Sequence, residues 1–282
     1  MTWQTSRRKI FLDRTLVMAI LNITPDSFSD GGRFMSTYDA IRRAEACIDE
    51  GADILDIGGE STRPGSLRVD AEDEIARVIP VIEAIAKRFD IPISIDTTKS
   101  GVARRAIDAG AEIVNDISGL RFDPMIANLA AESSCGLVLM HSRGTFETLH
   151  TEPPVEDVLA EVRTGLHNSV DKALAARVSE QQIVLDIGIG FGKTLPQNLE
   201  LLANIDKIRD AFPQLPLLVG VSRKSFIGKL LGGASLDERL SGSLAATVIV
   251  AAGGAKIVRV HDVKETIEAL KIADPVFKAR VL

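Results

Sequence analysis

The chain has 282 residues, of which 45% are hydrophobic and 26% are charged, as in ordinary globular proteins. Its formal net charge is −6 and only 4% of its residues are aromatic, so neither a basic surface nor a base-stacking platform for nucleic acid is expected. The length suits one large α/β unit, because α/β barrels commonly have about 250 residues.

The N-terminal residues have a weak similarity to a twin-arginine export signal at Arg7 and Arg8. Asp13 and Arg14 interrupt the apolar region that such a signal needs, and no small-residue cleavage site follows. No apolar run reaches the ~20 residues that span a membrane. Both cysteines, Cys47 and Cys135, lie outside any paired-ligand spacing, which favours buried thiols in a reducing compartment. We therefore expect a soluble, cytoplasmic protein with no membrane partner.

One pattern repeats along the chain: a short apolar run, a polar or glycine-rich loop, and an amphipathic helical stretch. The apolar runs cover residues 16–23, 52–58, 92–96, 112–117, 136–141, 183–187, 217–222 and 256–261. Strands that alternate with helices pair in parallel, and this number of them favours a closed (β/α)8 TIM barrel over an open sheet. No linker divides the sequence, so residues 1–282 are predicted to form a single domain. Residues 1–15 precede the repeat and are expected to cover the bottom of the barrel.

Local signals mark several helix ends. Residues 39–50 are predicted to form a helix that ends at Gly51. Asp123 and Pro124 predict a helix with proline in its first position. Two pairs have the spacing of capping boxes: Ser235 with Glu238, and Asp262 with Glu265.

Polar side chains stand at the carboxyl ends of most of the expected strands, and in a barrel these ends form the mouth of the active site. Side chains alternate between the two faces of a strand, so His141, next to Met140, is expected to turn toward the helices. The polar candidates at the mouth are Asn22, Glu60, Ser61, Thr62, Asp96, Asn115, Asp186, Ser222, Arg223, Lys224, Arg259 and His261.

Asp96 and Asp186 are acids within apolar strands, where a carboxylate is costly to bury unless it receives hydrogen bonds. One interpretation is a structural acid that is bonded to loop amides. The other is a binding role: with Asn115 and Lys224, the two acids could hold a planar heterocycle that is rich in donors and acceptors, such as a pterin.

A second set of residues favours anion binding, since Arg63, Arg223, Arg259 and His261 gather at the loops of an otherwise acidic protein. The glycines of residues 188–192 lack the acidic ribose partner of a dinucleotide site, so NAD is not expected. No zinc-ligand spacing occurs, but an asparagine at the mouth could bind Mg²⁺ together with a substrate diphosphate. No Ser-His-Asp set stands at plausible positions, so catalysis is expected to rely on positioning and charge stabilisation.

Six segments resemble the dihydropteroate synthases, pterin-binding barrels of bacterial folate biosynthesis. Two are highly specific: Asn-Ile-Thr-Pro-Asp-Ser-Phe-Ser-Asp-Gly-Gly at 22–32 and Asp-Ile-Gly-Gly-Glu-Ser-Thr-Arg-Pro-Gly at 56–65. The others are residues 95–99, 115–119, 190–193 and 222–228. The resemblance implies a homodimeric enzyme, the target of sulfonamides, that condenses p-aminobenzoate with 6-hydroxymethyl-7,8-dihydropterin diphosphate. The products are 7,8-dihydropteroate and pyrophosphate.

The resemblance also implies roles for individual residues. The implied pterin-binding residues are Asp96, Asn115, Ile117, Met140, Asp186 and Lys224. The implied diphosphate-binding residues are Asn22, Thr62, Arg63, Arg259 and His261, with Asn22 also on the Mg²⁺ ion. The implied p-aminobenzoate-binding residues are Phe28, Pro64, Phe191 and Ser222, and Lys224 borders both substrates. Loops near residues 24–34 and 60–68 are expected to close over the substrates and to bring Asp30 near the reacting amine. The resemblance implies that the catalytic residues are Asp30, Lys224 and Arg259.

Two positions depart from the family pattern. Ile187 replaces the usual proline after Asp186, and Ser142-Arg143 replaces the usual Met-x pair after Met140-His141. Two other functions compete with the synthase. One is a pterin-binding methyltransferase domain that acts with a corrinoid partner, which has no need for the loop of residues 26–32. The other is an inactive barrel that serves as a regulatory subunit.

Overall fold

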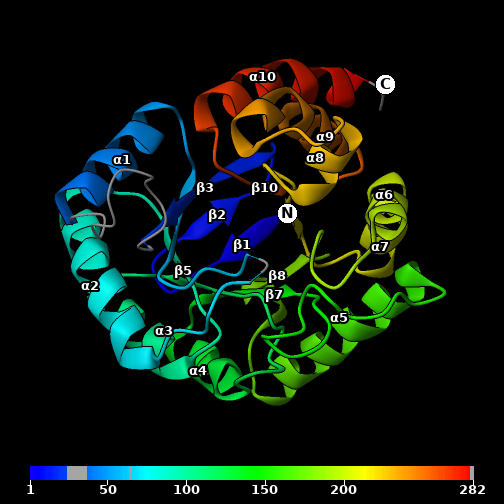
Figure 1. Cartoon of the computed structure of the whole chain (residues 1–282). Coiled ribbons are helices and arrows are strands. Elements are labelled where there is room, and N and C mark those ends of the chain that lie inside the picture. Colours follow the sequence, from blue (N-terminus) through cyan, green and yellow to red (C-terminus); the bar gives the residue numbers. More distant parts are fainter. Residues whose placement is uncertain (24–36, 64, 280–282) are drawn as a thin grey trace.

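The computed structural model describes residues 1–23, 37–63 and 65–279 of the chain. Parallel strands close into a barrel in the order β10-β3-β4-β5-β6-β7-β8-β9, so the first and last barrel strands are neighbours (Figure 1). The barrel strands are β3 Leu16–Asn22, β4 Ile54–Gly58, β5 Ile93–Asp96, β6 Ile113–Asp116, β7 Gly136–Met140, β8 Ile183–Asp186, β9 Leu217–Gly220 and β10 Ile257–Val260. Each lies inside the apolar run that predicted it.

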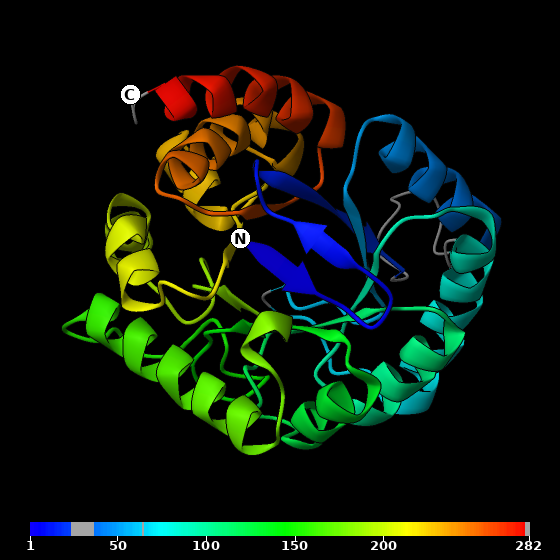
Figure 2. The ribbon, with the colours of Figure 1, turned by 180° about the vertical axis from the view of Figure 1, so that it is seen from behind.

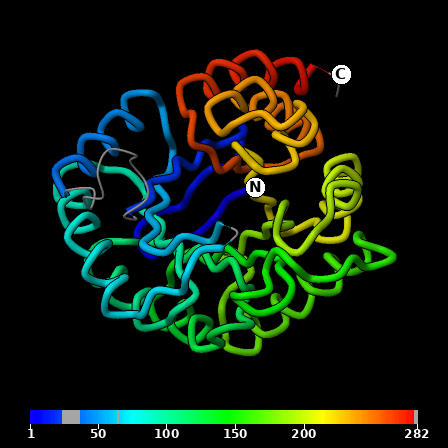
Figure 3. Tube along the Cα trace, in the orientation of Figure 1, coloured from blue at the N-terminus to red at the C-terminus, as the bar shows by residue number. Residues whose placement is uncertain are grey.

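Helices form the outer ring around these strands, and the chain passes round it in sequence order (Figure 3). The helices are α1 Thr37–Asp49, α2 Ala71–Arg88, α3 Ser100–Ala109, α4 Met125–Ser133, α5 Val158–Ala175, α6 Leu195–Ala203, α7 Ile205–Ala211, α8 Ser225–Leu230, α9 Leu240–Ala252 and α10 Val263–Ala279, with 3-10 turns at Glu180–Gln182 and Leu236–Arg239. The predicted (β/α)8 barrel is therefore confirmed. In the part of the chain that the structure describes, no helix is long and apolar enough to cross a membrane.

The predicted helix ends are right in outline and wrong in two details. The capping box of Ser235 and Glu238 is present, although it begins a 3-10 turn. Pro124 lies at the N-cap of α4, one residue earlier than predicted, while the Asp123 carboxylate accepts from the amide of Met125 at 3.0 Å. The carboxylate of Asp262, expected to cap α10, forms an ion pair with Arg223.

The barrel interior changes from apolar to polar along the strands. Buried side chains from the first residues of the strands, among them Met18, Ile54 and Val184, form one apolar cluster. Two residues further along the same inward face come Asp56 and Asp186, because side chains alternate along a strand. The strand register aligns Asn22 with Gly58 and Gly58 with Asp96, and likewise Asp96 with Asn115 and Met140 with Asp186. The polar layer therefore lies at the carboxyl end of the barrel.

The N-terminal residues lie at the opposite end. Strands β1 Thr2–Gln4 and β2 Lys9–Phe11 form an antiparallel hairpin, which crosses the barrel in the view from behind (Figure 2). Trp3 is fully buried in the apolar cluster of the strand starts, and its Nε1 donates to the carbonyl oxygen of Gln182 at 2.7 Å. A Cβ on Gly136 would lie 3.0 Å from the indole, so a small residue there accommodates the ring. The hairpin closes the bottom of the barrel.

Replacing Trp3 with alanine is expected to lower the free energy of unfolding by roughly 3–5 kcal/mol, because a large cavity would remain under the barrel. Thermal melting measures this loss. Phe11→Ala is the matched control, since that ring is 66% exposed on the same hairpin and exposed substitutions usually change stability by less than about 0.5 kcal/mol. Equal melting temperatures for the two variants would contradict a structural role for the hairpin.

Candidate active site

A cavity of about 430 Å³ lies at the carboxyl ends of the barrel strands. Side chains and loops from both halves of the chain surround it, as expected for a TIM-barrel site. Its lining includes Asn22, Glu60, Thr62, Arg63, Asp96, His150, Phe191, Ser222, Arg223, Lys224, Arg259 and His261. Most of the residues predicted for the site are thus brought together. Phe28, Asp30 and Pro64 lie outside the described residues.

Arg259 lies between two carboxylates. Its Nε donates to Asp56 Oδ2 at 2.6 Å, and its Nη2 donates to Asp96 Oδ2 at 2.5 Å. Asn115 Nδ2 donates to the same oxygen of Asp56 at 3.1 Å. Within the described part of the chain, Asp56 Oδ1 and Ser94 Oγ are buried without a hydrogen-bond partner. Charged groups are costly to bury, and unused acceptors beside them are typical of a site that receives a polar ligand.

Burial governs the ionisation of these groups. Burial raises the pKa of Asp96 to about 7, although the charge of Arg259 acts in the opposite direction. The pKa of Asp186 is also raised by burial, while its Oδ1 accepts from the amide of Gly188 at 2.7 Å. Burial alone would lower the pKa of Arg259, but the charges of Asp56 and Asp96 outweigh it and raise that pKa. The site therefore holds a permanent cation beside acids that a ligand's donor groups can stabilise.

Lys224 joins the polar layer to an aromatic wall. Its Nζ lies 4.2 Å from the centre of the Phe191 ring, within the range of a cation–π contact. Burial lowers the pKa of Lys224 to about 8, against the attraction of Asp186. Phe191 also belongs to an apolar cluster with Ile117 and Met140. Ile117 and Met140 do not line the cavity itself, and neither do Asn115 and Asp186, which lie beside it at the strand ends.

The same cavity is also lined by residues expected to bind an anion. Thr62 and Arg63 line it, and His261 Nδ1 lies 3.1 Å from Ser222 Oγ. Burial, reinforced by the charges of Arg259 and Arg223, lowers the pKa of His261 to about 3. His261 therefore contributes a hydrogen bond rather than a charge to the set of residues predicted to bind an anion. Arg223 is partly neutralised by its ion pair with Asp262.

The donors for a metal ion are sparse. Among the described residues, no group of three or more histidine, cysteine, aspartate or glutamate side chains could hold one. Asn22, the residue proposed as a Mg²⁺ ligand, lines the cavity and is aligned with Gly58 of β4, which is in turn aligned with Asp96 of β5. A single amide does not bind Mg²⁺ by itself, but it suits an ion that arrives with a diphosphate and keeps most of its ligands from phosphate and water.

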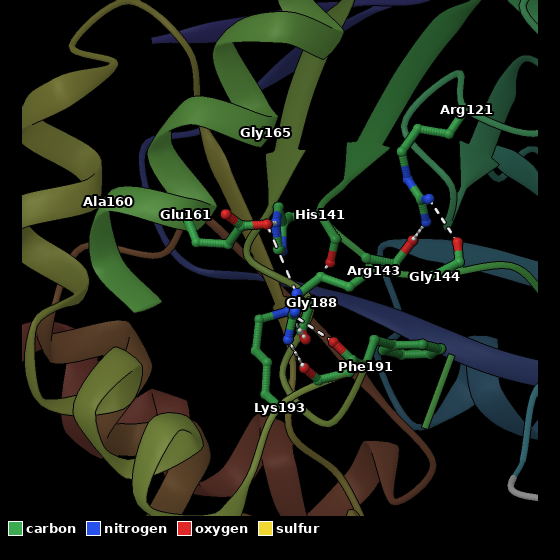
Figure 4. Close-up of polar contacts among 12 residues, drawn as sticks. Arg121, His141, Arg143, Gly144, Ala160, Glu161, Gly165, Gly188, Phe191 and Lys193 are labelled. Atoms are coloured by element: carbon green, nitrogen blue, oxygen red, sulfur yellow. Dashed lines mark hydrogen bonds and ion pairs between the residues drawn. The ribbon is translucent and has the colours of Figure 1, made fainter. Parts of the chain in front are cut away.

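Lys193 was not predicted, although it organises one wall of the cavity. Its Nζ donates to the carbonyl oxygens of Gly188 at 2.8 Å, Phe191 at 3.0 Å and His141 at 3.4 Å (Figure 4). Burial lowers its pKa to about 7. Gly188 has a φ of +64°, and a Cβ there would lie 1.8 Å from the carbonyl oxygen of His141, so only glycine fits. The loop that carries Phe191 is thus tied to the end of β7.

Both departures from the family pattern have structural consequences outside the cavity. Ile187 is fully buried in the core between barrel and helices. Ser142 Oγ accepts from Arg121 at 2.7 Å, and Arg143 donates to the carbonyl oxygen of Gly192 at 3.1 Å. The ring of His141 packs beside Gly165 of α5, which confirms that it turns toward the helices.

Asp56 is a further residue of this polar layer for which the sequence predicted no role. A signal for it was present, because Asp56 interrupts the apolar run 52–58 just as Asp96 interrupts its own strand. Its inward position follows from the alternation with Ile54, and its partner Arg259 lies 203 positions further along the chain.

Comparisons with known proteins agree with this geometry. The family model of pterin binding enzymes matches residues 18–261. The dihydropteroate synthase of Escherichia coli is 48% identical over 264 residues, which cover 94% of this chain and 92% of that protein. A structure of the Yersinia pestis dihydropteroate synthase with a sulfonamide drug complex has a TM-score of 0.92 and 40% identity, covering 99% of this chain and 100% of that one. A structure of the Xanthomonas albilineans dihydropteroate synthase with 4-aminobenzoic acid has a TM-score of 0.91 and 40% identity, covering 98% of each chain. Because the family model covers most of the chain and the identity to these relatives is 40–48%, the chain belongs to the pterin-binding enzymes and, among them, to the dihydropteroate synthases.

Proposed function

We propose that this transferase condenses 6-hydroxymethyl-7,8-dihydropterin diphosphate with p-aminobenzoate by loss of diphosphate followed by attack of the arylamine. The observation that carries the proposal is the position of Arg259. Its guanidinium bonds to Asp96, a proposed pterin ligand, and it lines the same cavity as Thr62 and Arg63, where the diphosphate would lie. A cation at this junction suits a reaction in which negative charge develops on the leaving group.

The pterin end of the cavity is proposed to involve Asp96, Asn115, Asp186 and Lys224. The amino-pyrimidinone edge of a pterin has several donors, and Asp96, whose carboxylate lines the cavity, offers acceptors to them. The raised pKa values of Asp96 and Asp186 mean that these acids gain more from a ligand's hydrogen bonds than exposed acids would. Ile117 and Met140 are proposed to lie against the ring.

The p-aminobenzoate end is proposed to involve Phe191, Ser222 and Lys224. Phe191 offers an aromatic face and Lys224 a charge beside it, which suits an aromatic carboxylate. The bound 4-aminobenzoic acid in the relative from Xanthomonas albilineans supports a site for this substrate in the family. Phe28, Pro64 and Asp30 are proposed to complete this end.

In the proposed mechanism the carbon–oxygen bond to the diphosphate breaks first, because the electron-rich pterin stabilises the cation that remains. Asn22 is proposed to hold a substrate-borne Mg²⁺, which would neutralise charge on the departing diphosphate. Arg259, Arg63 and Thr62 would bind the same oxygens, and His261 would donate one neutral hydrogen bond. The amine then attacks as the free base, and the protonated nitrogen that results releases its proton to the departing diphosphate or to water. The protein therefore needs to orient the amine more than to activate it.

The test is to mix the protein with the dihydropterin diphosphate, p-aminobenzoate and Mg²⁺ and to measure pyrophosphate and dihydropteroate. Formation of both supports the proposal. If neither product forms while the protein binds methyl-tetrahydrofolate, the result would favour a corrinoid-dependent methyltransferase over the synthase. Omitting Mg²⁺ with a chelator tests the metal, and an unchanged rate would remove it from the mechanism. The homodimer and the cytoplasmic location stay predictions from the sequence.

A pH dependence follows from Lys224, which burial makes easier to deprotonate, with a pKa of about 8. Because the pKa is lowered, the positive charge is present below about pH 8 and is lost as the pH rises through it. We expect kcat/KM for the pterin diphosphate to fall over this range. Lys224→Arg should have a lower maximal rate but no such fall, because guanidinium stays charged. The same pH step in both proteins would assign it to another group.

A further inference from the structure

Two loops that flank the cavity meet at His150. The loop after β4 carries Thr62 and Arg63, and the loop after β8 carries Gly190 and Phe191. His150 Nε2 lies 2.8 Å from the carbonyl oxygen of Thr62, and its Nδ1 lies 3.2 Å from the carbonyl oxygen of Gly190. The same imidazole contacts the Phe191 ring, with centroids 5.5 Å apart and an angle of 33° between the planes. One side chain therefore touches the diphosphate side and the aromatic side of the cavity.

The two partners of this imidazole are of the same chemical kind. Both are carbonyl oxygens, which accept hydrogen bonds and cannot donate them. A neutral imidazole has one N–H, so it can satisfy only one of them and would turn a lone pair toward the other. The imidazolium has two N–H groups and satisfies both. The geometry therefore favours the charged ring.

The remaining contacts of the β8 loop show why His150 matters. The carbonyl oxygens of Gly188 and Phe191 accept from Lys193, and that of Gly192 accepts from Arg143. These bonds fix the loop to its own side of the barrel, near β7. The bond from His150 to Thr62 extends the same network across the cavity to the loop after β4.

We propose that His150, as an imidazolium, is a positioning residue that holds these two loops together. It fixes the distance between Phe191, which is proposed to contact the arylamine substrate, and the Thr62–Arg63 segment, which is proposed to face the diphosphate. This inference rests on the proposed synthase function, since it assigns the two loops to the two substrates. His150 acts through the loops and takes no part in bond breaking.

His150→Phe separates the two properties of the side chain, because it keeps an aromatic ring beside Phe191 and removes both N–H groups. We expect kcat/KM for p-aminobenzoate to fall about tenfold, mainly through KM, the loss expected for one charge-assisted hydrogen bond. His150→Gln, whose amide has two N–H hydrogens, should recover part of the loss. His167→Phe is the matched control, because that histidine contacts Phe212 with centroids 4.4 Å apart, outside the cavity. Equal KM values for His150→Phe and the control would overturn the positioning role.

The charge is tested separately, by nitrogen-15 NMR of the histidine side chains at the pH of the assay. The chain has only 4 histidines. His141 and His261, with pKa values lowered by burial to about 2 and about 3, supply neutral rings as internal references. The signal that disappears in His150→Gln or His150→Phe should show two protonated nitrogens, and a singly protonated ring would overturn the imidazolium bridge. The spectrum needs no turnover, so this result stands apart from the pyrophosphate assay of the unaltered protein, which tests the synthase function.

Discussion

Replacing Arg259 with alanine is expected to lower kcat/KM about 1,000-fold, the upper range for the loss of one group that stabilises developing charge. The guanidinium bonds to Asp96 and lines the same cavity as Arg63. Without it, the departing diphosphate loses a permanent positive charge. His261 cannot replace that charge, because its ring is neutral. Steady-state release of pyrophosphate measures the effect. A rate within a few fold of the unaltered protein would contradict the proposed role.

The same substitution also removes a structural partner, and this effect must be measured separately. Asp56 is fully buried and bonds to Arg259. Breaking a buried ion pair from one side costs roughly 3–5 kcal/mol, because the other charge remains without compensation. Arg14→Ala is a suitable control, since Arg14 pairs with Asp53 near the bottom of the barrel, where its side chain is 46% exposed. Arg14→Ala should lose little stability and no activity. Arg259→Lys should recover some stability but less activity, because lysine cannot bond to two carboxylates in the same plane.

The sequence predicts most of the fold because each barrel strand carries its own signal. A parallel strand covered on both faces is a short apolar run, and Pro92 or Gly136 marks where such a run begins. The polar residue at its end then identifies the carboxyl edge. Alternation along the strand was enough to predict that His141 turns outward, because successive side chains point to opposite faces of a strand.

The contacts between strands were not predictable in the same way. The bond between Arg259 and Asp56 joins residues 203 positions apart, and neither position indicates the other. The sequence predicted no role for Lys193 or His150 for a different reason. Their partners are backbone carbonyl oxygens, which every residue has, so no pattern of side chains marks them. The sequence could predict which residue types stand at the strand ends. Identifying the hydrogen-bond partner of each charged side chain required the three-dimensional structure.

Asp96→Asn is expected to raise KM for the pterin diphosphate about 100-fold, which corresponds to the loss of a hydrogen bond to a charged group worth roughly 2.7 kcal/mol. The carboxylate presents acceptors only, whereas asparagine would turn an N–H toward the donors of the pterin edge. Arg259 keeps its bond to Asp56, so the cation should remain in place. The affinity for the pterin diphosphate, measured by calorimetry without p-aminobenzoate, checks this step alone.

Asp116→Asn supplies the matched control. Asp116 is also buried, and burial raises its pKa as it does for Asp96. Its carboxylate accepts from the amides of Ser118 at 2.8 Å and Leu120 at 2.7 Å, so it stabilises the turn after β6 and does not line the cavity. Asp116→Asn should therefore lower the melting temperature and leave the pterin affinity unchanged. Asp96→Asn should instead lower the pterin affinity with a smaller change in melting temperature, because Arg259 keeps its bond to Asp56. If both variants changed only the melting temperature, Asp96 would be a structural acid of the barrel and the pterin would be held elsewhere.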